Sequence, residues 1–244
     1  MTDYKISVVV RTYNEEKHLG ELLDKLESQT YTNYEVVVVD SESTDTTREI
    51  ALQHQANVVS IRKSDFNYSY SSNVGVANAT GDIVCFLSGH SVPVKDTYLR
   101  DICDVFSANP AIGGCYGDVV ALPDGSWVEK AFNQLGYLKN KIRGKEKGMV
   151  LENAVHPGIF SCSNAAARRD LLLKHPFIEE LGDGGEDIEV AYRMIQDGFF
   201  VAQVPELLVM HSHGIGLIQF LQQYKKWQKM YQKVLEYIRK DSKI

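Results

Sequence analysis

The N-terminal half of the chain alternates short apolar runs with segments of helical periodicity. Four runs have the pattern of buried strands: Ile6 to Val10, Val36 to Val39, Val58 to Ile61 and Ile83 to Leu87. Helical spacing or capping signals mark the stretches Glu15 to Gln29, Thr46 to His54, Ser71 to Ala79 and Asp96 to Phe106. This order predicts an α/β fold in which a doubly wound, mostly parallel sheet is flanked by helices on both faces.

The second half is less regular. Strands are predicted at Gly113 to Leu122, Phe160 to Ser163, Phe199 to Val204 and Leu207 to Met210. Helices are predicted at Trp127 to Ile142 and Glu186 to Asp197, and a charged loop at Arg143 to Gly148. We expect residues 1–216 to form one domain, with halves of about 1–95 and 96–216, followed by an amphipathic helix over 217–244.

Composition excludes several classes of protein. The 244 residues carry a net charge of −6, which disfavours a nucleic-acid binder with a global basic field. The four cysteines form no C-x-x-C pair, so structural zinc and a disulfide scaffold are poor interpretations. No apolar run reaches the roughly 18 residues of a membrane span, and the start of the chain lacks a signal-peptide pattern. A cytoplasmic location is therefore expected.

Sheets of this type bind ligands beyond the carboxyl ends of their strands, which directs attention to the loops after Val10, Val39 and Leu87. Neither G-x-G-x-x-G nor a P-loop is present, which disfavours dinucleotide oxidoreductases and P-loop NTPases. A carboxylate at Asp40 suits a base N–H or a ribose hydroxyl, and Thr12 with backbone N–H groups suits a phosphate. The alternative is helix capping, for which these loops offer Asn14, Ser43, Thr44 and Asp45.

Taken together, five motifs resemble the inverting glycosyltransferases of family 2, which have the GT-A fold, and in particular their bacterial rhamnosyltransferase-like branch. The motifs occur in the family's order: Val8 to Glu16, Val37 to Thr47, Gly81 to Leu87, Gly184 to Glu189 with Arg193, and His211 to His213. Phe66, Tyr68, Ser69, Asn73 and Gly75, with Val92-Pro93, resemble the branch. The resemblance covers roughly residues 5–216.

The resemblance implies a nucleotide-sugar donor site in the first half of the domain, with UDP or dTDP as the expected nucleotide. It places Thr12, Tyr13, Glu15, Asp40 and Ser41 around the nucleoside. Asn73 is expected to line the pocket behind them. The branch often carries an arginine directly before this asparagine, whereas here Ser72 stands there.

The main departure from the family lies after the fourth strand. Relatives carry an Asp-x-Asp site there that holds a divalent cation, and this chain has Ser88-Gly89-His90. A cation, Mn²⁺ or Mg²⁺, would neutralise the charge on the departing nucleoside diphosphate. His90 is a candidate ligand, joined by His211 or His213, and nitrogen favours Mn²⁺ over Mg²⁺. Two alternatives stay open: a metal-free phosphate contact by His90, and loss of the function.

Glu186 and Asp187 open a predicted helix, where acidic residues commonly complement the helix dipole. The resemblance implies instead that Asp187 is the general base that takes the proton of the acceptor hydroxyl, and that Glu186 shapes the acceptor site. A similar segment of relatives lies near the donor, so Arg168 is a further candidate diphosphate contact.

Residues 217–244 are basic, with seven Lys or Arg against two acidic residues, and have apolar residues at helical spacing. The helix is expected to pack on the domain, to pair with other glycan-synthesis subunits, or to lie on the inner face of the membrane. Many relatives use polyprenyl-linked acceptors, so a glycan or polyprenyl-linked hydroxyl acceptor is expected.

Two other functions stay open. A catalytically silent nucleotide-sugar-binding or scaffold module would explain the missing Asp-x-Asp. A nucleotidyltransferase can share the sheet architecture, although the chain lacks a Gly-rich first loop followed by lysine.

Overall fold

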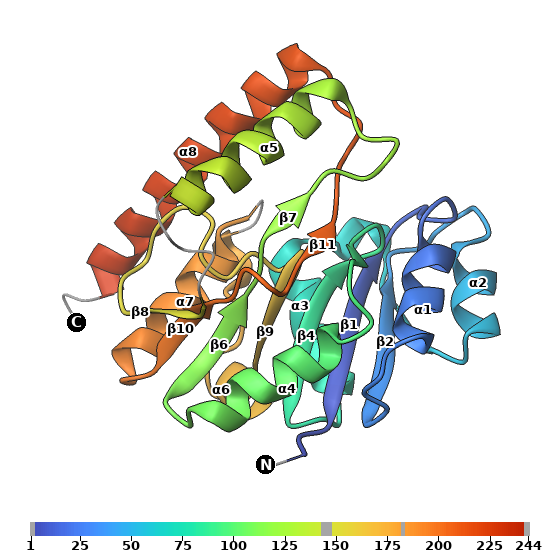
Figure 1. Ribbon diagram of the computed structural model, residues 1–244, viewed down its shortest axis with the longest axis horizontal. Helices are drawn as coiled ribbons and strands as arrows, with labels where there is room; N and C mark the ends of the chain where they lie inside the picture. Colours follow the sequence, from blue (N-terminus) through green and yellow to red (C-terminus); the bar gives the residue numbers. More distant parts are fainter. Residues whose placement is uncertain (1–2, 143–147, 182–183, 242–244) are drawn as a thin grey trace.

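The fold is described from a computed structural model that covers residues 3–142, 148–181 and 184–241 (Figure 1). The first half contains β1 (Ile6–Thr12), α1 (Leu19–Glu27), β2 (Tyr34–Asp40), α2 (Thr47–Gln53), β3 (Asn57–Ser60), α3 (Tyr68–Asn78), β4 (Ile83–Ser88), β5 (Val92–Pro93) and α4 (Tyr98–Ala108). The second half contains β6 (Ile112–Tyr116), β7 (Val119–Val120), α5 (Trp127–Ile142), β8 (Val150–Glu152), β9 (Asn164–Arg168), α6 (Arg169–Lys174), α7 (Glu186–Gln196), β10 (Phe200–Gln203), β11 (Val209–Met210) and α8 (Leu217–Asp241). Apart from Gly148, the charged loop expected at Arg143 to Gly148 lies outside the described residues.

The central sheet has eight strands in the order β3-β2-β1-β4-β9-β6-β10-β8. Strands β3, β2, β1 and β4 are parallel neighbours, and β10 is parallel to β6. Strand β9 is antiparallel to both of its neighbours, and β8 is antiparallel to β10. The predicted α/β fold with a mostly parallel sheet is therefore confirmed.

Side chains that alternate along the strands build a core on each face of the sheet. In β1, Val8 and Val10 join one core, which α1, α2 and α4 cover. Val9 joins the other core, to which α3, α6, α7 and α8 contribute. Strands buried on both faces explain the continuous apolar runs in the sequence.

One predicted strand is wrong. The run from Phe160 to Ser163 forms no strand, and Phe160 has a φ of 56°, a left-handed conformation that breaks an extended chain. The strand is β9, directly after it, with the sequence Asn-Ala-Ala-Ala-Arg. Alanine has little strand preference, so propensity favoured the wrong segment.

A smaller sheet, β5-β11-β7, leads into two long helices that lie side by side above the main sheet (Figure 1). Helix α8 follows β11 and packs against α5 and α7. Its last turns bury Val234 and Ile238 in the domain core, so the expected C-terminal helix packs on the domain along this part. Among the residues that the structure describes, no helix has both the length and the apolar character needed to cross a bilayer.

Candidate functional site

The polar loops meet at one edge of the sheet. Arg11 at the end of β1 pairs with Ser88 of β4, and Thr12 pairs with Asp40 of β2. Because β9 runs antiparallel to β4, Asn164 begins β9 at this same edge, next to Leu87. The topology therefore brings the ends of β1, β2 and β4 together, as the strand-end rule predicts.

The loops after β1 and β2 hold each other in place. The Asn14 N–H donates to the Ser43 hydroxyl at 2.9 Å, and the Thr44 N–H donates to the Asn14 side chain at 2.9 Å. The Glu16 N–H donates to the Asp45 carboxylate at 3.2 Å. These polar side chains thus bond across two loops. The residues directly before α1 and α2, His18 and Thr46, make no side-chain cap, but the Asp45 carboxylate accepts from the N–H of Thr47 at 3.0 Å at the start of α2.

The predicted nucleoside residues divide into buried and exposed groups. Thr12, Asp40 and Ser41 are buried. The Asp40 carboxylate accepts hydrogen bonds from the Thr12 hydroxyl and from the hydroxyl and N–H of Ser43. Tyr13 is 39% exposed, and the Lys63 ammonium lies 4.1 Å from the centre of its ring. Tyr13 is therefore partly exposed, with Lys63 over one face of its ring, whereas buried Asp40 holds the loop through its hydrogen bonds.

One prediction for the donor site needs correction, and another stays a prediction. The Asn73 amide bonds to both backbone groups of Phe177, at 2.9 Å each, and anchors the segment before α7; its expected place behind the nucleoside pocket stays a prediction. Arg168 pairs with Ile83 at the opposite edge of the sheet, and its guanidinium donates to the Ile112 carbonyl. The antiparallel course of β9 is the reason, and it removes Arg168 from any diphosphate at the strand ends.

The segment that replaces Asp-x-Asp is a tight turn. The Ser91 N–H donates to the Ser88 carbonyl at 2.9 Å, and the Gly89 N–H donates to the Arg11 carbonyl at 3.1 Å. A Cβ at Gly89 would lie 2.6 Å from Cγ of Glu15, so this position accommodates only glycine without movement of Glu15. Glu15 in turn lies 2.8 Å from Nδ1 of His90. Glu15 therefore contacts His90, and its expected place beside the nucleoside stays a prediction.

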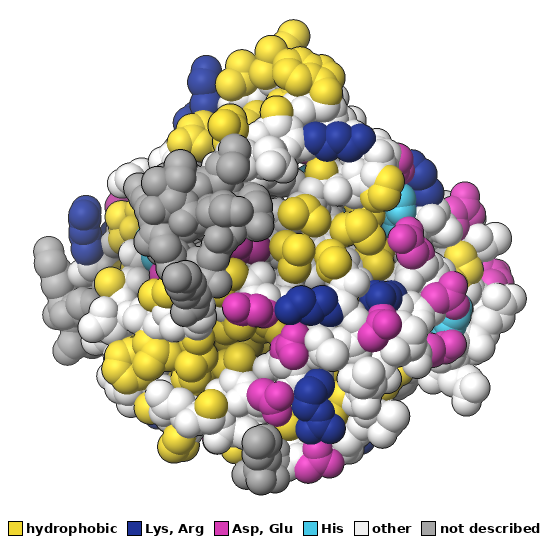
Figure 2. Space-filling model, in the orientation of Figure 1, with side chains coloured by type: hydrophobic (Ala, Val, Ile, Leu, Met, Phe, Trp, Pro, Cys, Tyr) yellow, Lys and Arg dark blue, Asp and Glu magenta, His cyan; other side chains and the backbone are white. Residues whose placement is uncertain are grey.

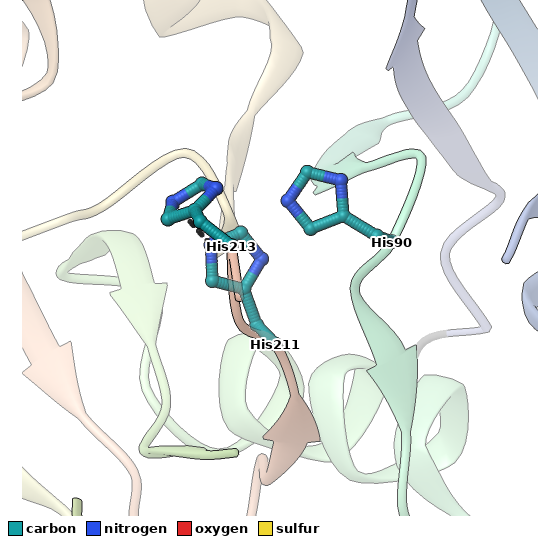
Figure 3. Close-up of side chains that lie close together, drawn as sticks. All are labelled: His90, His211 and His213. Atoms are coloured by element: carbon teal, nitrogen blue, oxygen red, sulfur yellow. Dashed lines mark hydrogen bonds between the residues drawn. The ribbon is translucent and has the colours of Figure 1, made fainter. Parts of the chain in front are cut away.

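His90, His211 and His213 form one cluster (Figure 3). His90 comes from the turn after β4, and the other two come from the segment after β11. Each offers a ring nitrogen within 4.8 Å of the others, a spacing that suits a metal ion. A cavity of about 290 Å³ adjoins His90 and His213 and is also lined by Glu15. The sequence-predicted histidines are thus brought together.

Burial and mutual repulsion act on these imidazoles. Burial lowers the pKa of His211 well below its usual value, and the neighbouring His90 and His213 lower it further. Burial and the charge of His90 also lower the pKa of His213, against the opposing pull of Glu129 and Glu15. Both shifts favour the neutral imidazole, the form that binds metals.

The start of α7 carries a second cluster, the carboxylates of Glu186 and Asp187, and α8 packs against the turn that precedes them. Gly184 and Gly185 have φ values of 129° and 93°, which favour glycine. A Cβ at Gly184 would lie 2.6 Å from Sδ of Met230, and one at Gly185 would lie 2.5 Å from Val234. The close approach of α8 fixes the turn from which the Glu186 and Asp187 side chains project.

The two carboxylates of α7 have an unusual electrostatic setting. Glu186 is 4% exposed, and burial raises its pKa, although Arg11 opposes the shift. Asp187 is partly exposed, yet burial and the Glu186 charge raise its pKa to about 8. Perturbed carboxyl groups of this kind are frequent at catalytic sites.

Arg11 is the functional candidate that the sequence analysis missed. Its guanidinium lies 3.9 Å from Glu186 and also donates to the Ser72 hydroxyl at 3.2 Å. It lowers the pKa of both His211 and Asp187, so its charge acts on the histidine cluster and on the α7 carboxylates. Ser72 is the position at which the resembling branch often carries an arginine. The one sequence signal for Arg11 was its place as a charged residue directly after the apolar run Ile6 to Val10.

Comparison with solved structures places this architecture among GT-A glycosyltransferases. The mannosyltransferase PcManGT from Pyrobaculum calidifontis, solved in complex with GDP-Man and Mn²⁺, aligns with a TM-score of 0.65 at 23% identity, covering 86% of this chain and 57% of that one. Glucosyl-3-phosphoglycerate synthase from Mycobacterium tuberculosis, solved with Mn²⁺, UDP and glucosyl-3-phosphoglycerate, aligns with a TM-score of 0.65 at 21% identity, covering 95% and 80%.

The sequence assigns the family. Residues 7–175 match the model of glycosyl transferase family 2, and the chain belongs to this family. The O-antigen chain rhamnosyltransferase RfbN of Salmonella typhimurium is 27% identical over 222 residues, which are 90% of this chain and 70% of that protein. The chain is therefore a glycosyltransferase, and it spans little more than half the length of the mannosyltransferase PcManGT.

Proposed function

We propose that the chain transfers a sugar from a nucleoside-diphosphate donor to a hydroxyl acceptor with inversion at the anomeric carbon, in the assembly of a bacterial surface glycan. The observation that carries this proposal is the position of Asp187 at the start of α7, with a pKa raised to about 8. A carboxylate of raised basicity is suited to take the proton of an attacking hydroxyl, since a general base works best with a pKa near the working pH.

The reaction needs one such base. As the acceptor oxygen attacks, its proton passes to Asp187, and the sugar–phosphate bond breaks on the opposite side of the anomeric carbon. Glu186 is buried and paired with Arg11, which leaves Asp187 as the more open carboxylate. Glu186 then shapes the acceptor side, and Arg11 connects it to the donor side.

The donor nucleotide would occupy the edge formed by the loops after β1 and β2. Tyr13 supplies an exposed ring for the base, and the interlocked loops supply backbone groups held by Thr12, Asp40 and Ser41. The expected donors carry UDP or dTDP. The mannosyltransferase neighbour was solved with GDP-Man and the mycobacterial synthase with UDP, so GDP-sugars belong in the same test.

The histidine cluster is the proposed cation site. Three imidazoles meet at the position where the family carries Asp-x-Asp, and the buried Nε2 of His90 has no hydrogen-bond partner among the described residues. Both structural neighbours were solved with Mn²⁺. A divalent cation held by these residues would offset the negative charge that develops on the departing diphosphate.

The acceptor is proposed to be a glycan or a polyprenyl-linked hydroxyl, approached from α5 and α8. These helices expose apolar side chains near the tip where α8 begins, and hydrophobic surface gathers at the tip of the molecule in Figure 2. The exposed apolar side chains are Trp127, Phe132 and Leu135 of α5 and Leu217, Ile218, Leu221, Tyr224 and Trp227 of α8. Exposed Lys225, Lys226 and Lys229 accompany them, which favours peripheral contact with an anionic membrane over a purely apolar protein partner.

A donor screen tests the proposal. UDP-, dTDP- and GDP-sugars are added to the protein with and without Mn²⁺, and the melting temperature is followed as ligand concentration increases. A ligand of the native state raises it. Transfer to an acceptor then separates an enzyme from a silent binding module, which would bind a donor without transferring or hydrolysing its sugar. Pyrophosphate release from a nucleoside triphosphate would point to a nucleotidyltransferase.

A further inference from the structure

The histidine cluster has an all-nitrogen donor set. Figure 3 shows the rings of His90, His211 and His213 gathered together. The His90 and His211 rings are stacked with centroids 4.6 Å apart, and the His213 ring lies edge-on to both. Nε2 of His211 and Nε2 of His213 are 3.3 Å apart. None of the three residues contributes an oxygen donor. The Asp-x-Asp site of the resembling family offers carboxylates instead, so this chain presents a different ligand chemistry.

Glu15 determines which nitrogen of His90 is available. Its carboxylate lies 2.8 Å from Nδ1, and a carboxylate accepts, so Nδ1 carries the hydrogen. In a neutral ring the lone pair is then on Nε2, the atom that is buried without a hydrogen-bond partner among the described residues. A buried nitrogen lone pair is unfavourable unless it accepts a hydrogen bond or binds a cation.

The other two histidines are also held by neighbours. Nδ1 of His211 lies 2.9 Å from the Ser91 hydroxyl, in the same turn as His90. The backbone N–H of His213 donates to the Glu129 carboxylate at 2.7 Å. Metal-binding histidines are characteristically oriented by a carboxylate or hydroxyl on the ring nitrogen away from the metal, as Ser91 does for His211, whereas the bond at His213 holds its backbone.

We propose that these residues form a site selective for transition metals, in which His90, His211 and His213 bind the ion through nitrogen and Glu15 is a positioning residue for His90. Imidazole suits Zn²⁺, Co²⁺, Ni²⁺ and, more weakly, Mn²⁺, whereas Mg²⁺ and Ca²⁺ prefer oxygen. Three protein ligands would leave further coordination positions for water or a substrate oxygen, and a cavity of about 290 Å³ adjoins His90 and His213. This inference rests on the proposed function for the role of the ion, but not for its binding.

The test is direct metal binding in the absence of donor and acceptor. The metal-free protein is titrated with Co²⁺ or Zn²⁺ against a chromogenic chelator, and Mg²⁺ is measured by calorimetry. We expect one Co²⁺ or Zn²⁺ per chain, bound at least about 100-fold more tightly than Mg²⁺, and a visible Co²⁺ absorption typical of nitrogen ligands. Equal affinities for Co²⁺ and Mg²⁺ would overturn the proposal.

Variants separate ligands from the positioning residue. His90→Ala and His211→Ala should each abolish the Co²⁺ spectrum. The control is His175→Ala, which should leave the spectrum unchanged because native His175 contacts Asp197, outside the cluster. Glu15→Gln keeps the side-chain shape and should weaken Co²⁺ binding about 10- to 100-fold while keeping one ion per chain. Unchanged Co²⁺ affinity in folded His90→Ala, checked by circular dichroism, would refute the site.

The outcome is independent of the transfer reaction. Chain that binds Co²⁺ through the histidines but transfers no sugar would contradict the proposed function and support this inference. Chain that transfers sugar with full activity after chelation, and binds no Co²⁺, would do the reverse.

Discussion

The guanidinium of Arg11 lies 3.9 Å from a carboxylate oxygen of Glu186, and this ion pair joins the end of β1 to the first residue of α7. Both side chains are largely buried, and the second oxygen of Glu186 has no hydrogen-bond partner among the described residues. The donor side and the acceptor side of the proposed site are thus connected by one charge pair. Removing either partner leaves the other charge poorly compensated.

Arg11→Met is expected to destabilise the fold by about 1–3 kcal/mol, because buried Glu186 loses its counter-charge and must bind a proton. Urea unfolding of Arg11→Met, Glu186→Gln and the double variant measures the coupling. The double variant should recover part of the loss caused by Arg11→Met. Strict additivity of the two single effects would show that the pair does not interact.

The raised pKa of Asp187 predicts a pH-dependent stability. The folded chain holds this proton up to about pH 8, whereas an unfolded aspartate releases it near 3.8. Between these values the folded state binds more protons, so the contribution of Asp187 to the free energy of unfolding decreases as pH rises.

Asp187→Asn removes this dependence. The free energy of unfolding is measured in urea at pH 5 and at pH 8.5. Its decrease between the two pH values should be smaller for the variant than for the native chain, by more than about 1 kcal/mol. Asp104→Asn, at an exposed position of α4, is the matched control and should follow the native chain. Parallel curves for native chain and Asp187→Asn would contradict the raised pKa.

The contact between Gly89 and Glu15 predicts a defect in metal binding. Gly89→Ala places a Cβ 2.6 Å from Cγ of Glu15 and should displace this carboxylate from His90. Chelator competition with Co²⁺ should then show weaker binding, by about 10-fold or more. Gly136→Ala in α5, where a Cβ meets nothing within 4 Å, should leave the Co²⁺ affinity unchanged and stabilise the helix by up to ~1 kcal/mol.

The exposed start of α8 predicts binding to anionic vesicles. The native chain should co-sediment with vesicles that contain phosphatidylglycerol, and less with phosphatidylcholine alone, because apolar and basic residues act together there. Replacing Leu217, Ile218 and Leu221 by serine should reduce this binding. Leu173→Ser, at an equally exposed leucine of α6, is the control. Equal sedimentation of all variants would contradict membrane contact through α8.

The sequence predicted the parts of the fold that depend on local pattern. Aliphatic runs located β1, β2 and β4, and the rule for strand ends located the polar edge. Strand β9 escaped because three alanines carry almost no strand signal, although small residues suit the centre of a sheet buried on both faces. This error also misplaced Arg168, since the direction of a strand is a tertiary property.

Within the site, the histidine cluster was predictable because each of its members stands in a recognisable motif. The pairing of Glu15 with His90 and of Arg11 with Glu186 was not, because each pair joins residues 75 or more positions apart. The bond between Asn73 and Phe177 was unpredictable for a similar reason, since the two residues lie 104 positions apart. Such contacts follow from the packing of whole elements and leave no local signal.

The central claim is that Asp187 accepts the proton of the acceptor hydroxyl, and one comparison tests it most directly. Once the screen has identified a donor, transfer rates and donor affinity are measured for native chain, Asp187→Asn and Asp104→Asn, and the anomeric configuration of the product is read by NMR. The account predicts an inverted product and a loss of about 10²- to 10⁴-fold in kcat for Asp187→Asn with donor affinity unchanged. Native turnover in Asp187→Asn, or a product with retained configuration, would contradict it.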